Sequence, residues 1–444
     1  MMNILIIGAS AAGISAAETL RKLDKNCNIT ILTKENCNRP YSKSLLAYLF
    51  SNRIDLNKIY FKPKNFFEKY NLTYFNNEEV IEIDRKNKFI KTKNNKKLNY
   101  DKLLLATGSK SFIPEINNIS LNNIFTFNEY QNYQDIKKNL NNAKNIVVLG
   151  AGFVGLEIAY ALNNLGFDVS IVEKCSQILP NQMDNTGSYF IQKELENKGI
   201  KFFLNQSIIE IEGSKNISNV ILSDKTRLKS NMLIICSGVI PNKEIAKNAD
   251  LETKKGLVVD EYLTTSDNNI YGAGDIIELY DITTKSSNCS GSWANAVIQG
   301  QYAAYNILGY KKRYKNFIAV QNSIQFYNVA ATSNGKVHID LSDDQSNYEV
   351  LSIKEKNYYK KIVLRDNKII GFILINKINQ AGLLSALIKL QLDISEYKEK
   401  LLYDDFTYSY FIDEKFEQYN AYAEIPDCWK YNEWYLERKF CAGI

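Results

Sequence analysis

The chain has 444 residues, of which 45% are hydrophobic and 23% are charged, a composition typical of a globular protein of about three domains. Its 55 basic and 49 acidic side chains leave a net charge of +6 that is spread over the whole chain. Because nucleic-acid binding requires a concentrated basic stripe, we expect no nucleic-acid partner.

The cysteines and the hydropathy pattern suggest the cellular compartment. Seven cysteines stand at positions 27, 37, 175, 236, 289, 428 and 441, and no two have C-x-x-C spacing. An odd number of thiols without a disulfide framework is typical of reduced cysteines, so we expect a cytoplasmic protein. We also assign no metal-ligating residues. No stretch reaches the roughly 20 apolar residues that span a bilayer. The start also lacks the positive region of a signal peptide.

The first elements in chain order are predicted to be a strand, a glycine turn and a helix. Residues 3–23 read NILIIGASAAGISAAETLRKL, in which an apolar run precedes Gly8 and an alanine-rich run surrounds Gly13. This plan is that of a dinucleotide-binding unit, although Ser10 replaces the middle glycine of G-x-G-x-x-G. The small side chain of Ser10 should still allow a close approach, and its hydroxyl can donate a hydrogen bond to a phosphate oxygen.

The same plan recurs in residues 145–173, NIVVLGAGFVGLEIAYALNNLGFDVSIVE, and this internal repeat is the strongest signal in the sequence. Gly150 is expected to make the turn, and Gly152 to let the backbone approach a pyrophosphate. Gly155 is expected to let the helix pack tightly on the strand. In both units the phosphates should lie at the N-terminus of the helix.

An acid ends each unit, about 20 residues after the glycine turn. Glu35 follows the second strand of the first unit, at residues 28–35, and Glu173 ends the second unit. Both are placed to accept a hydrogen bond from a ribose 2′-hydroxyl, and the alternative for either is a solvated strand end. The carboxylate of Glu173 should repel the 2′-phosphate of NADPH, which favours NADH.

Three further apolar strands end in glycine-containing turns. They lie at residues 100–109, with Ala106, Thr107 and Gly108, at 231–242, with Gly238, and at 269–276, with Gly274 and Asp275. Two cofactor units that are each closed by such a strand fit an insertion of the second unit into the first. We therefore predict an α/β fold with two Rossmann-like dinucleotide-binding domains, 1–112 plus 242–317 for the first and 113–241 for the second.

The remaining section, 318–444, is predicted to be a C-terminal α+β domain. It contains a strand-like run at 361–376, a helix-like run at 380–402 and an aromatic tail.

Together these motifs resemble those of the pyridine nucleotide-disulfide oxidoreductase superfamily, whose members bind two dinucleotides. The stretches NRPYSKSLLAYLF (38–50), SGSWANAVIQGQYAAYNILG (290–309) and AVQNSIQFYNVAATSNG (319–335) look most similar to its branch of NADH:rubredoxin reductases, NADH oxidases and the flavoprotein part of nitrite reductases. The resemblance covers essentially the whole chain. It implies FAD on the first unit, NADH on the second and a C-terminal interface domain that is a candidate for homodimerisation.

The resemblance also implies roles for individual residues. The FAD-binding set is Gly8, Ser10, Ala11, Gly13, Glu35, Lys43, Ala106, Thr107, Gly108, Gly274 and Asp275. The NADH-binding set is Gly150, Gly152, Val154, Gly155, Glu173 and Gly238. The candidate catalytic residues are Lys43 near the phosphates or flavin, Glu157 near the nicotinamide and Trp293 beside the isoalloxazine. The alternatives are a solvated lysine at 43 and a core or interface aromatic at 293.

The chain departs from the superfamily in its non-flavin redox centre. Disulfide reductases carry C-x-x-x-x-C beside the flavin, whereas here Cys37 is followed by Ser42. Ser44 or a neighbour stands where single-cysteine members carry their thiol. A serine hydroxyl cannot cycle through a sulfenic acid or a disulfide, so we expect no dithiol chemistry beside the flavin. Cys37 is expected to be structural, and the tail places Cys428 and Cys441 too far apart in sequence to suggest a pair.

We therefore hypothesise an FAD-dependent NADH:acceptor oxidoreductase. Hydride should pass directly from nicotinamide C4 to flavin N5, and electrons should then pass to a small redox protein such as a rubredoxin. Two alternatives stay open. One is an NADH oxidase with O₂ as acceptor, and the other is a flavoprotein sensor or subunit of a larger complex with little turnover of its own.

Overall fold

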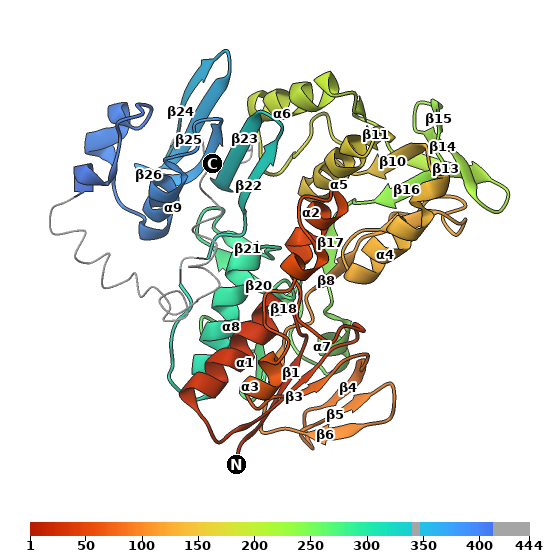
Figure 1. Cartoon of the computed structure of the whole chain (residues 1–444). Coiled ribbons are helices and arrows are strands. Elements are labelled where there is room, and N and C mark those ends of the chain that lie inside the picture. The colour runs from red at the N-terminus through yellow and green to blue at the C-terminus, as the bar shows by residue number, and fades with distance from the viewer. Residues whose placement is uncertain (316, 340–346, 412–444) are drawn as a thin grey trace.

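The computed structural model describes residues 1–315, 317–339 and 347–411, and three five-stranded sheets organise them (Figure 1). Two of these sheets are parallel and the third is antiparallel. This confirms the predicted α/β class, with two Rossmann-like units and a C-terminal α+β unit. The predicted aromatic tail, with Cys428 and Cys441, lies outside the described residues. Among the described residues, no helix has the length and apolar character needed to cross a membrane.

The first sheet is entirely parallel, as expected for apolar strands covered on both faces. Its strand order is β19 (Ile270–Gly272), β7 (Lys102–Leu105), β1 (Asn3–Ile7), β2 (Asn28–Leu32) and β3 (Thr73–Phe75). Helices α1 (Ala11–Leu23) and α8 (Trp293–Ile307) pack against each other beside it (Figure 1). A three-stranded antiparallel sheet of β4 (Val80–Asp84), β5 (Phe89–Thr92) and β6 (Lys97–Asn99) branches off.

The second sheet repeats this plan. Its parallel strands are ordered β12 (Lys201–Phe203), β11 (Asp168–Val172), β10 (Asn145–Leu149), β16 (Met232–Ile235) and β9 (Ile124–Thr126). The associated helices are α4 (Tyr130–Asn139), α5 (Phe153–Asn164) and α6 (Asn185–Asn197). Its antiparallel branch consists of β13 (Ile208–Gly213), β14 (Ile217–Leu222) and β15 (Arg227–Lys229). The repeat seen in the sequence is therefore a repeat of structure.

A two-stranded antiparallel ribbon connects the two units. The outgoing strand β8 (Ser109–Ser111) pairs with the returning strand β17 (Val239–Pro241). The domain boundaries expected from the sequence, 112/113 and 241/242, fall at the ends of these two strands. The boundaries themselves stay a prediction, but the chain leaves and re-enters the first unit side by side at this ribbon.

The third sheet is antiparallel, with the order β22 (Gln321–Phe326), β23 (Val329–Gly335), β26 (Lys368–Ile375), β25 (Tyr358–Arg365) and β24 (Tyr348–Glu355). Helix α9 (Ala381–Leu390) packs on it. The continuous helix expected over 380–402 is wrong, because Gln391 adopts the left-handed region with φ +51°. The amide of Ile394 then donates to the carbonyl of Asn367 rather than to its own helix.

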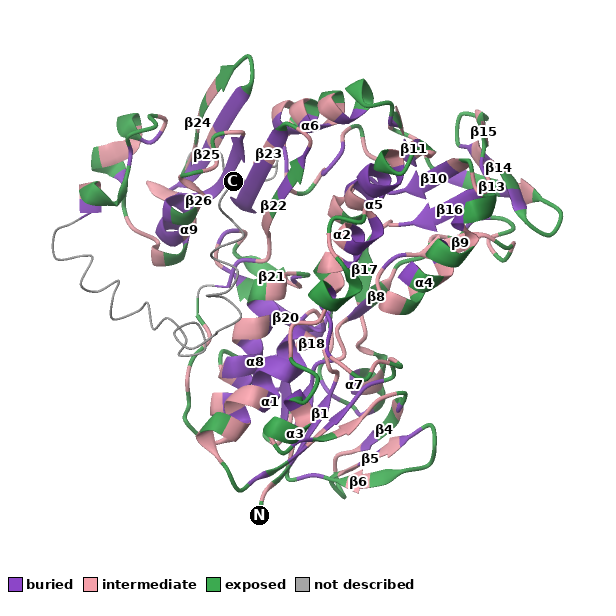
Figure 2. Ribbon diagram, in the orientation of Figure 1, coloured by how far each residue is buried: buried purple, intermediate pink, exposed green. Residues whose placement is uncertain are grey.

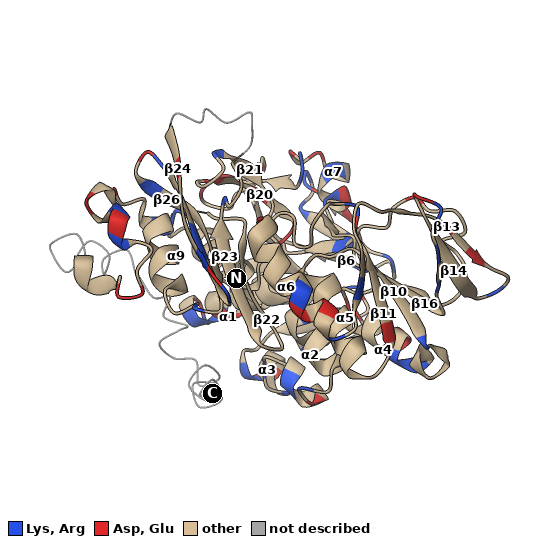
Figure 3. Cartoon of the chain, turned by 90° about the horizontal axis from the view of Figure 1, so that it is seen from above, with Lys and Arg blue, Asp and Glu red and all other residues tan. Residues whose placement is uncertain are grey.

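Burial and charge follow the layers. The strands of the large sheets are mostly buried and the outer sides of the helices exposed (Figure 2). Basic and acidic residues are interspersed on α4, α6 and α7 (Glu244–Asn248), so none of these helices presents a face of one sign (Figure 3). The remaining α-helices and strands are short: α2 (Leu46–Phe50), α3 (Phe66–Lys69), β18 (Leu257–Val258), β20 (Ile277–Asp281) and β21 (Ser286–Asn288).

Asp184 joins the second unit to the third sheet. One carboxylate oxygen accepts the amide of Gly187 at 2.9 Å and so caps α6. The other accepts the hydroxyl of Tyr359 at 2.6 Å and pairs with Nζ of Lys361 at 2.9 Å. Burial raises the pKa of Asp184, but these donors outweigh it, so the pKa lies below the ordinary aspartate value.

Asp184→Asn should keep the helix cap and remove the charge that faces Lys361. We expect a loss of about 1–3 kcal/mol of folding free energy at pH 7, because a charge-assisted hydrogen bond is replaced by a neutral one. A depressed folded-state pKa contributes stability above the unfolded pKa of about 3.9, and this stability is lost as pH falls through the folded value. Thermal unfolding of wild type and variant at pH 7 and pH 3 measures the difference.

Asp168→Asn, an exposed aspartate on β11, is the matched control and should leave stability unchanged at both pH values. A difference between wild type and Asp184→Asn that is as large at pH 3 as at pH 7 would contradict the ion-pair account.

Candidate functional site

The first glycine of each motif makes a turn that requires glycine. Gly8 and Gly150 have φ of +118° and +106°. A Cβ atom at Gly8 would lie 2.0 Å from the carbonyl oxygen of Ala106, and one at Gly150 would lie 2.4 Å from that of Cys236. These separations are far below van der Waals contact, so both positions exclude a side chain whether or not a ligand is bound.

The third glycine lets each helix pack directly on the turn. A Cβ atom at Gly13 would lie 1.9 Å from the carbonyl oxygen of Gly8, and one at Gly155 would lie 2.0 Å from that of Gly150. The N-termini of α1 and α5 are therefore held at the carboxyl ends of β1 and β10. Unpaired amides and the helix dipole make such N-termini favourable for a phosphate.

The middle position of the motif is constrained less by the fold. Gly152 is the N-cap of α5 with φ −75°, and a Cβ atom there would meet nothing within 4 Å. Ser10 is the N-cap of α1 with φ −100°, and its side chain makes no capping hydrogen bond. The fold thus accommodates a small side chain here, and the Ser10 hydroxyl can turn toward a ligand at the helix N-terminus.

A cavity of about 900 Å³ opens beside this N-terminus, within the range of about 300–1,000 Å³ typical of small-molecule sites. The predicted site residues that line it are Gly8, Ser10, Ala11, Glu35, Lys43, Ala106, Thr107, Gly108, Val154, Glu157, Gly274, Asp275 and Trp293. Residues from the first unit, from α5 and from β22 thus meet at one cavity. Gly13, beneath the first turn, and Gly150, Gly152, Gly155, Glu173 and Gly238 of the second unit are not among its lining residues.

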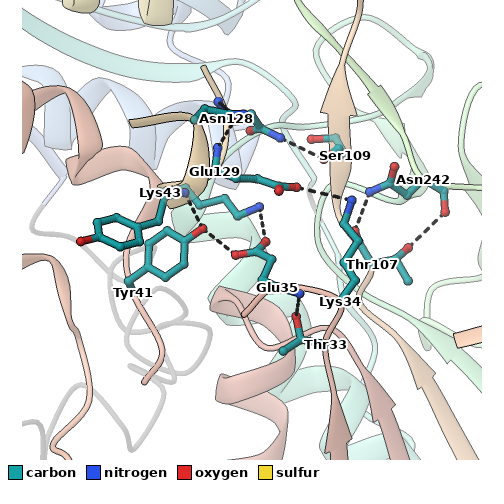
Figure 4. A network of polar contacts seen from close by, with 12 residues as sticks. Thr33, Lys34, Glu35, Tyr41, Lys43, Thr107, Ser109, Asn128, Glu129 and Asn242 are labelled. Atoms are coloured by element: carbon teal, nitrogen blue, oxygen red, sulfur yellow. Dashed lines mark hydrogen bonds and ion pairs between the residues drawn. The ribbon is translucent and has the colours of Figure 1, made fainter. Parts of the chain in front are cut away.

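Glu35 is the centre of a polar network on the cavity wall (Figure 4). Its carboxylate pairs with Nζ of Lys43 at 2.8 Å and accepts the hydroxyl of Tyr41 at 2.5 Å. The Tyr41 oxygen in turn accepts the amide of Tyr130 at the start of α4, at 3.0 Å. Burial raises the pKa of Glu35, but Lys43 and Tyr41 outweigh it and hold the pKa below its usual value. Glu35 is therefore an ionised acceptor at neutral pH.

A reciprocal pair of hydrogen bonds joins the two connections between the units (Figure 4). The side-chain amide of Asn242 donates to the carbonyl of Thr107 at 2.8 Å, and the Thr107 hydroxyl donates to the carbonyl of Asn242 at 3.1 Å. The backbone amide of Asn242 also donates, to the carbonyl of Gly108 at 2.9 Å. The cavity wall at 107–108 is therefore tied to the chain that returns from the second unit.

Asp275 lies in the cavity wall next to a glycine turn. Gly274 has φ +83°, and the carboxylate of Asp275 accepts the hydroxyl of Ser109 at 3.0 Å. Burial raises the pKa of Asp275, and Ser109 and Lys43 only partly offset this. A group that donates a hydrogen bond to Asp275 would therefore be strongly favoured, because the carboxylate is poorly solvated.

Glu157 brings a carboxyl group from α5 to the same cavity. Burial raises its pKa to about 7, with only Arg53 acting in the opposite direction. Val154, one helical turn earlier, also lines the cavity. The charge of this wall therefore changes near neutral pH.

Glu173 supports the second glycine turn directly. Its carboxylate accepts the amides of Ala151 at 2.7 Å and Cys175 at 2.9 Å. Each carboxylate oxygen retains a second lone pair after accepting one bond. The expected contact of Glu173 with a ribose hydroxyl is thus compatible with this geometry and stays a prediction.

The described lining residues of the cavity include aromatic and hydroxyl groups but no pair of thiols. The ring of Trp293 meets that of Phe61 edge to face at 5.0 Å between centroids. Ser44 lines the cavity, and its hydroxyl hydrogen-bonds that of Ser42 at 2.8 Å. Among the described lining residues the one cysteine is Cys37, whose pKa is raised by burial and whose thiol donates to the carbonyl of Arg39. A thiolate nucleophile is therefore not favoured here.

Sequence reasoning missed Tyr41 and Asn242. Tyr41 stands six residues after Glu35, and Asn242 ends the strand–turn segment 231–242, but neither residue belongs to a motif with fixed spacing. Their partners, Tyr130 and Thr107, are 89 and 135 residues away in the chain.

The described residues fit FAD in the first unit. The turn at Gly8 has no room for a Cβ atom, the Ser10 hydroxyl is uncapped, and the ionised Glu35 follows β2 where a ribose hydroxyl is expected. The poorly solvated Asp275 lines the same cavity.

Comparison with known proteins gives matches over most of the chain. Residues 2–300 match the family model described as pyridine nucleotide-disulphide oxidoreductase, and residues 321–392 match that of the rubredoxin NAD+ reductase C-terminal domain. A protein of Bacillus subtilis named assimilatory nitrate reductase electron transfer subunit is 28% identical over 401 residues, which is 90% of this chain and 51% of that protein. The chain thus spans about half the length of this relative.

For two further proteins, the match covers a larger share of the matched protein's own length. The protein named NADH oxidase from Methanocaldococcus jannaschii is 35% identical over 322 residues, 70% of this chain and 71% of that protein. The crystal structure of the NADH:rubredoxin oxidoreductase from Clostridium acetobutylicum matches with a TM-score of 0.72 and 24% identity over 89% of this chain and 96% of that one. With the outer glycines of both turns in place and a family model matched over 2–300, the chain belongs to the pyridine nucleotide-disulphide oxidoreductase family.

Proposed function

We propose that the chain is an FAD-dependent NADH:acceptor oxidoreductase that passes electrons to a small redox protein of the rubredoxin type. The observation that carries this proposal is the single cavity at which the Gly8 turn of the first unit meets Val154 and Glu157 of the second. A dinucleotide on each unit would bring its reactive ring to this shared space. Relatives named for NADH oxidation and rubredoxin reduction, and the rubredoxin reductase C-terminal match, support it.

The residues of the chain would bind and orient rather than exchange covalent bonds. FAD, when bound, would supply hydride acceptance from NADH. Ser10 and the α1 N-terminus would hold the pyrophosphate, Glu35 a ribose hydroxyl, and Asp275 the opposite end of the cofactor. Gly150, Gly152, Gly155 and Gly238 would hold NADH, with Glu173 favouring NADH over NADPH. Trp293 and Phe61 would cover one end of the cavity against water.

The choice of rubredoxin over oxygen rests on the lining of the cavity. By the family resemblance, Ser44 or a neighbour takes the position of the thiol in single-cysteine members, and Ser42 that of the second cysteine of a disulfide pair. We therefore propose that electrons leave directly for an outside acceptor. An NADH oxidase remains the second candidate, because the relative of that name is 35% identical. Pairing of two copies through the third sheet is also part of the proposal.

Stopped-flow mixing tests the acceptor. The full chain, loaded with FAD and reduced with NADH, is mixed with oxidised rubredoxin or with air-saturated buffer, and the flavin absorbance is followed. We expect rubredoxin to reoxidise the flavin at the turnover rate and air to be slower. Reoxidation by air at the turnover rate would favour the oxidase. Failure of rubredoxin, air and a redox dye alike would favour a non-catalytic subunit or sensor.

Substitutions at Ser10 test the first glycine turn as a pyrophosphate site. Ser10→Gly should bind FAD within about threefold of wild type, because the fold does not need the side chain. Ser10→Leu should weaken binding by about 100-fold or more, because the branched side chain would occupy the space of the phosphates. FAD retention after gel filtration and fluorescence titration measures both. Equal affinity of Ser10→Leu and Ser10→Gly would move the pyrophosphate away from this turn.

Glu157→Gln tests the half-buried carboxyl of the shared cavity. An acid whose folded-state pKa is raised loses folding free energy as pH rises from its unfolded value of about 4.3 to the folded value of about 7. The variant should therefore match wild type near pH 4 and exceed it by about 3–4 kcal/mol at pH 8. Chemical denaturation across this pH range measures the gap, and the exposed Glu210→Gln serves as control. A gap independent of pH would contradict the shifted titration.

A further inference from the structure

At Gly300, the backbone of helix α8 packs directly against the first turn of α1, with no side chain between them. A Cβ atom at Gly300 would lie 2.2 Å from the carbonyl oxygen of Ala12. The two helix backbones are therefore in direct contact, two residues after the Ser10 N-cap. Such a contact fixes the position of α8 along α1, and so relative to the glycine turn, because no flexible side chain lies between the two helices.

The residue before Gly300 reaches the other turn of the cofactor cavity. Gln299 is 1% exposed, and its Oε1 accepts the amide of Gly274 at 2.9 Å. A Cβ atom at Gly274 would lie 3.2 Å from Cβ of Ala12, so this turn also rests on α1. Asp275 follows immediately and lines the cavity.

The Gln299 side chain also has a polar neighbour in the same helix region. Burial raises the pKa of the Tyr314 hydroxyl, Gln299 lowers it, and this hydroxyl donates to Oδ1 of Asn295 at 3.4 Å. A side chain that is 1% exposed and engaged through its oxygen has few alternative rotamers, so the position of this oxygen is well defined. Without that acceptor, the buried amide of Gly274 would have to find another partner by moving the turn.

We propose that Gln299 is a positioning residue for FAD: with Gly300 seated on Ala12, it sets the Gly274–Asp275 turn in register with the Ser10 turn. This inference rests on the proposed function, because it assumes that FAD occupies the cavity. Gln299 does not line the cavity and acts through Asp275. The proposed cofactor contacts at Ser10 and Asp275 come from distant parts of the chain. Two adjacent residues of α8 hold them in place: Gly300 contacts the helix that follows Ser10, and Gln299 binds the turn that precedes Asp275.

Two substitutions of similar size separate hydrogen bonding from packing. Gln299→Met removes the acceptor oxygen and should raise the FAD dissociation constant about tenfold or more, because the turn amide is left unpaired. Gln299→Glu keeps an acceptor oxygen and should stay within about threefold of wild type. Gln301→Met, at a neighbouring buried glutamine of α8, controls for the loss of a buried amide. Fluorescence titration of the full chains with FAD, together with the visible flavin spectrum, measures all three.

A double-mutant cycle with Asp275→Asn tests the route of the effect. If Gln299 acts through Asp275, Gln299→Met should cost much less FAD affinity in the Asp275→Asn background than in wild type. Additive effects, or a Gln299→Met chain that binds FAD like wild type, would overturn the inference. A wild-type chain that binds no FAD would overturn the proposed function itself, which keeps the two failures distinct. If Gln299→Met does not fold, Gln299→Asn, whose amide is one methylene too short, carries the same expectation.

Discussion

The structure depends on direct backbone contact at the start of two helices. Gly13 sits on the carbonyl of Gly8, and Gly155 sits on that of Gly150, with no room for a Cβ atom at either contact. These contacts aim the helix N-termini at the carboxyl ends of the parallel strands. The proposed phosphate contacts follow from that placement, because the amides and the helix dipole need no charged side chain.

The physical reason for a small residue at the middle position of the motif differs from the reason for glycine at the two outer positions. The outer glycines are required by contacts within the chain itself, so they would be needed without a ligand. Space for a side chain exists at Gly152 and is used at Ser10. A serine here therefore weakens the motif as a pattern but is compatible with the proposed phosphate contact, because a small hydroxyl can donate a hydrogen bond where glycine would allow a close approach of the backbone.

Features carried by short stretches could be predicted from the sequence, and pairings across the chain could not. The strands, the turns at Gly8 and Gly150, and the doubled plan are local patterns of apolar runs and glycines. The pairing of Asn242 with Thr107 depends on which distant strands become neighbours, and no spacing rule encodes it. The helix expected over 380–402 failed because helix periodicity does not reveal the left-handed turn at Gln391, where the chain returns to bond the β25–β26 turn.

The same distinction separates the cofactor chemistry from the acceptor. The proposed cofactor contacts come from backbone turns and a few acids, which the doubled motif specifies. In the proposed function, the fate of the electrons depends on what stands beside the flavin. The described residues that line the cavity include serine hydroxyls, the Trp293 ring that meets Phe61, and Cys37 as the one thiol. Because these lining residues offer no pair of thiols, the proposed route for the electrons leads directly to an outside acceptor. On this proposal, the acceptor is selected at the surface of the protein more than by the cavity that binds the nucleotides.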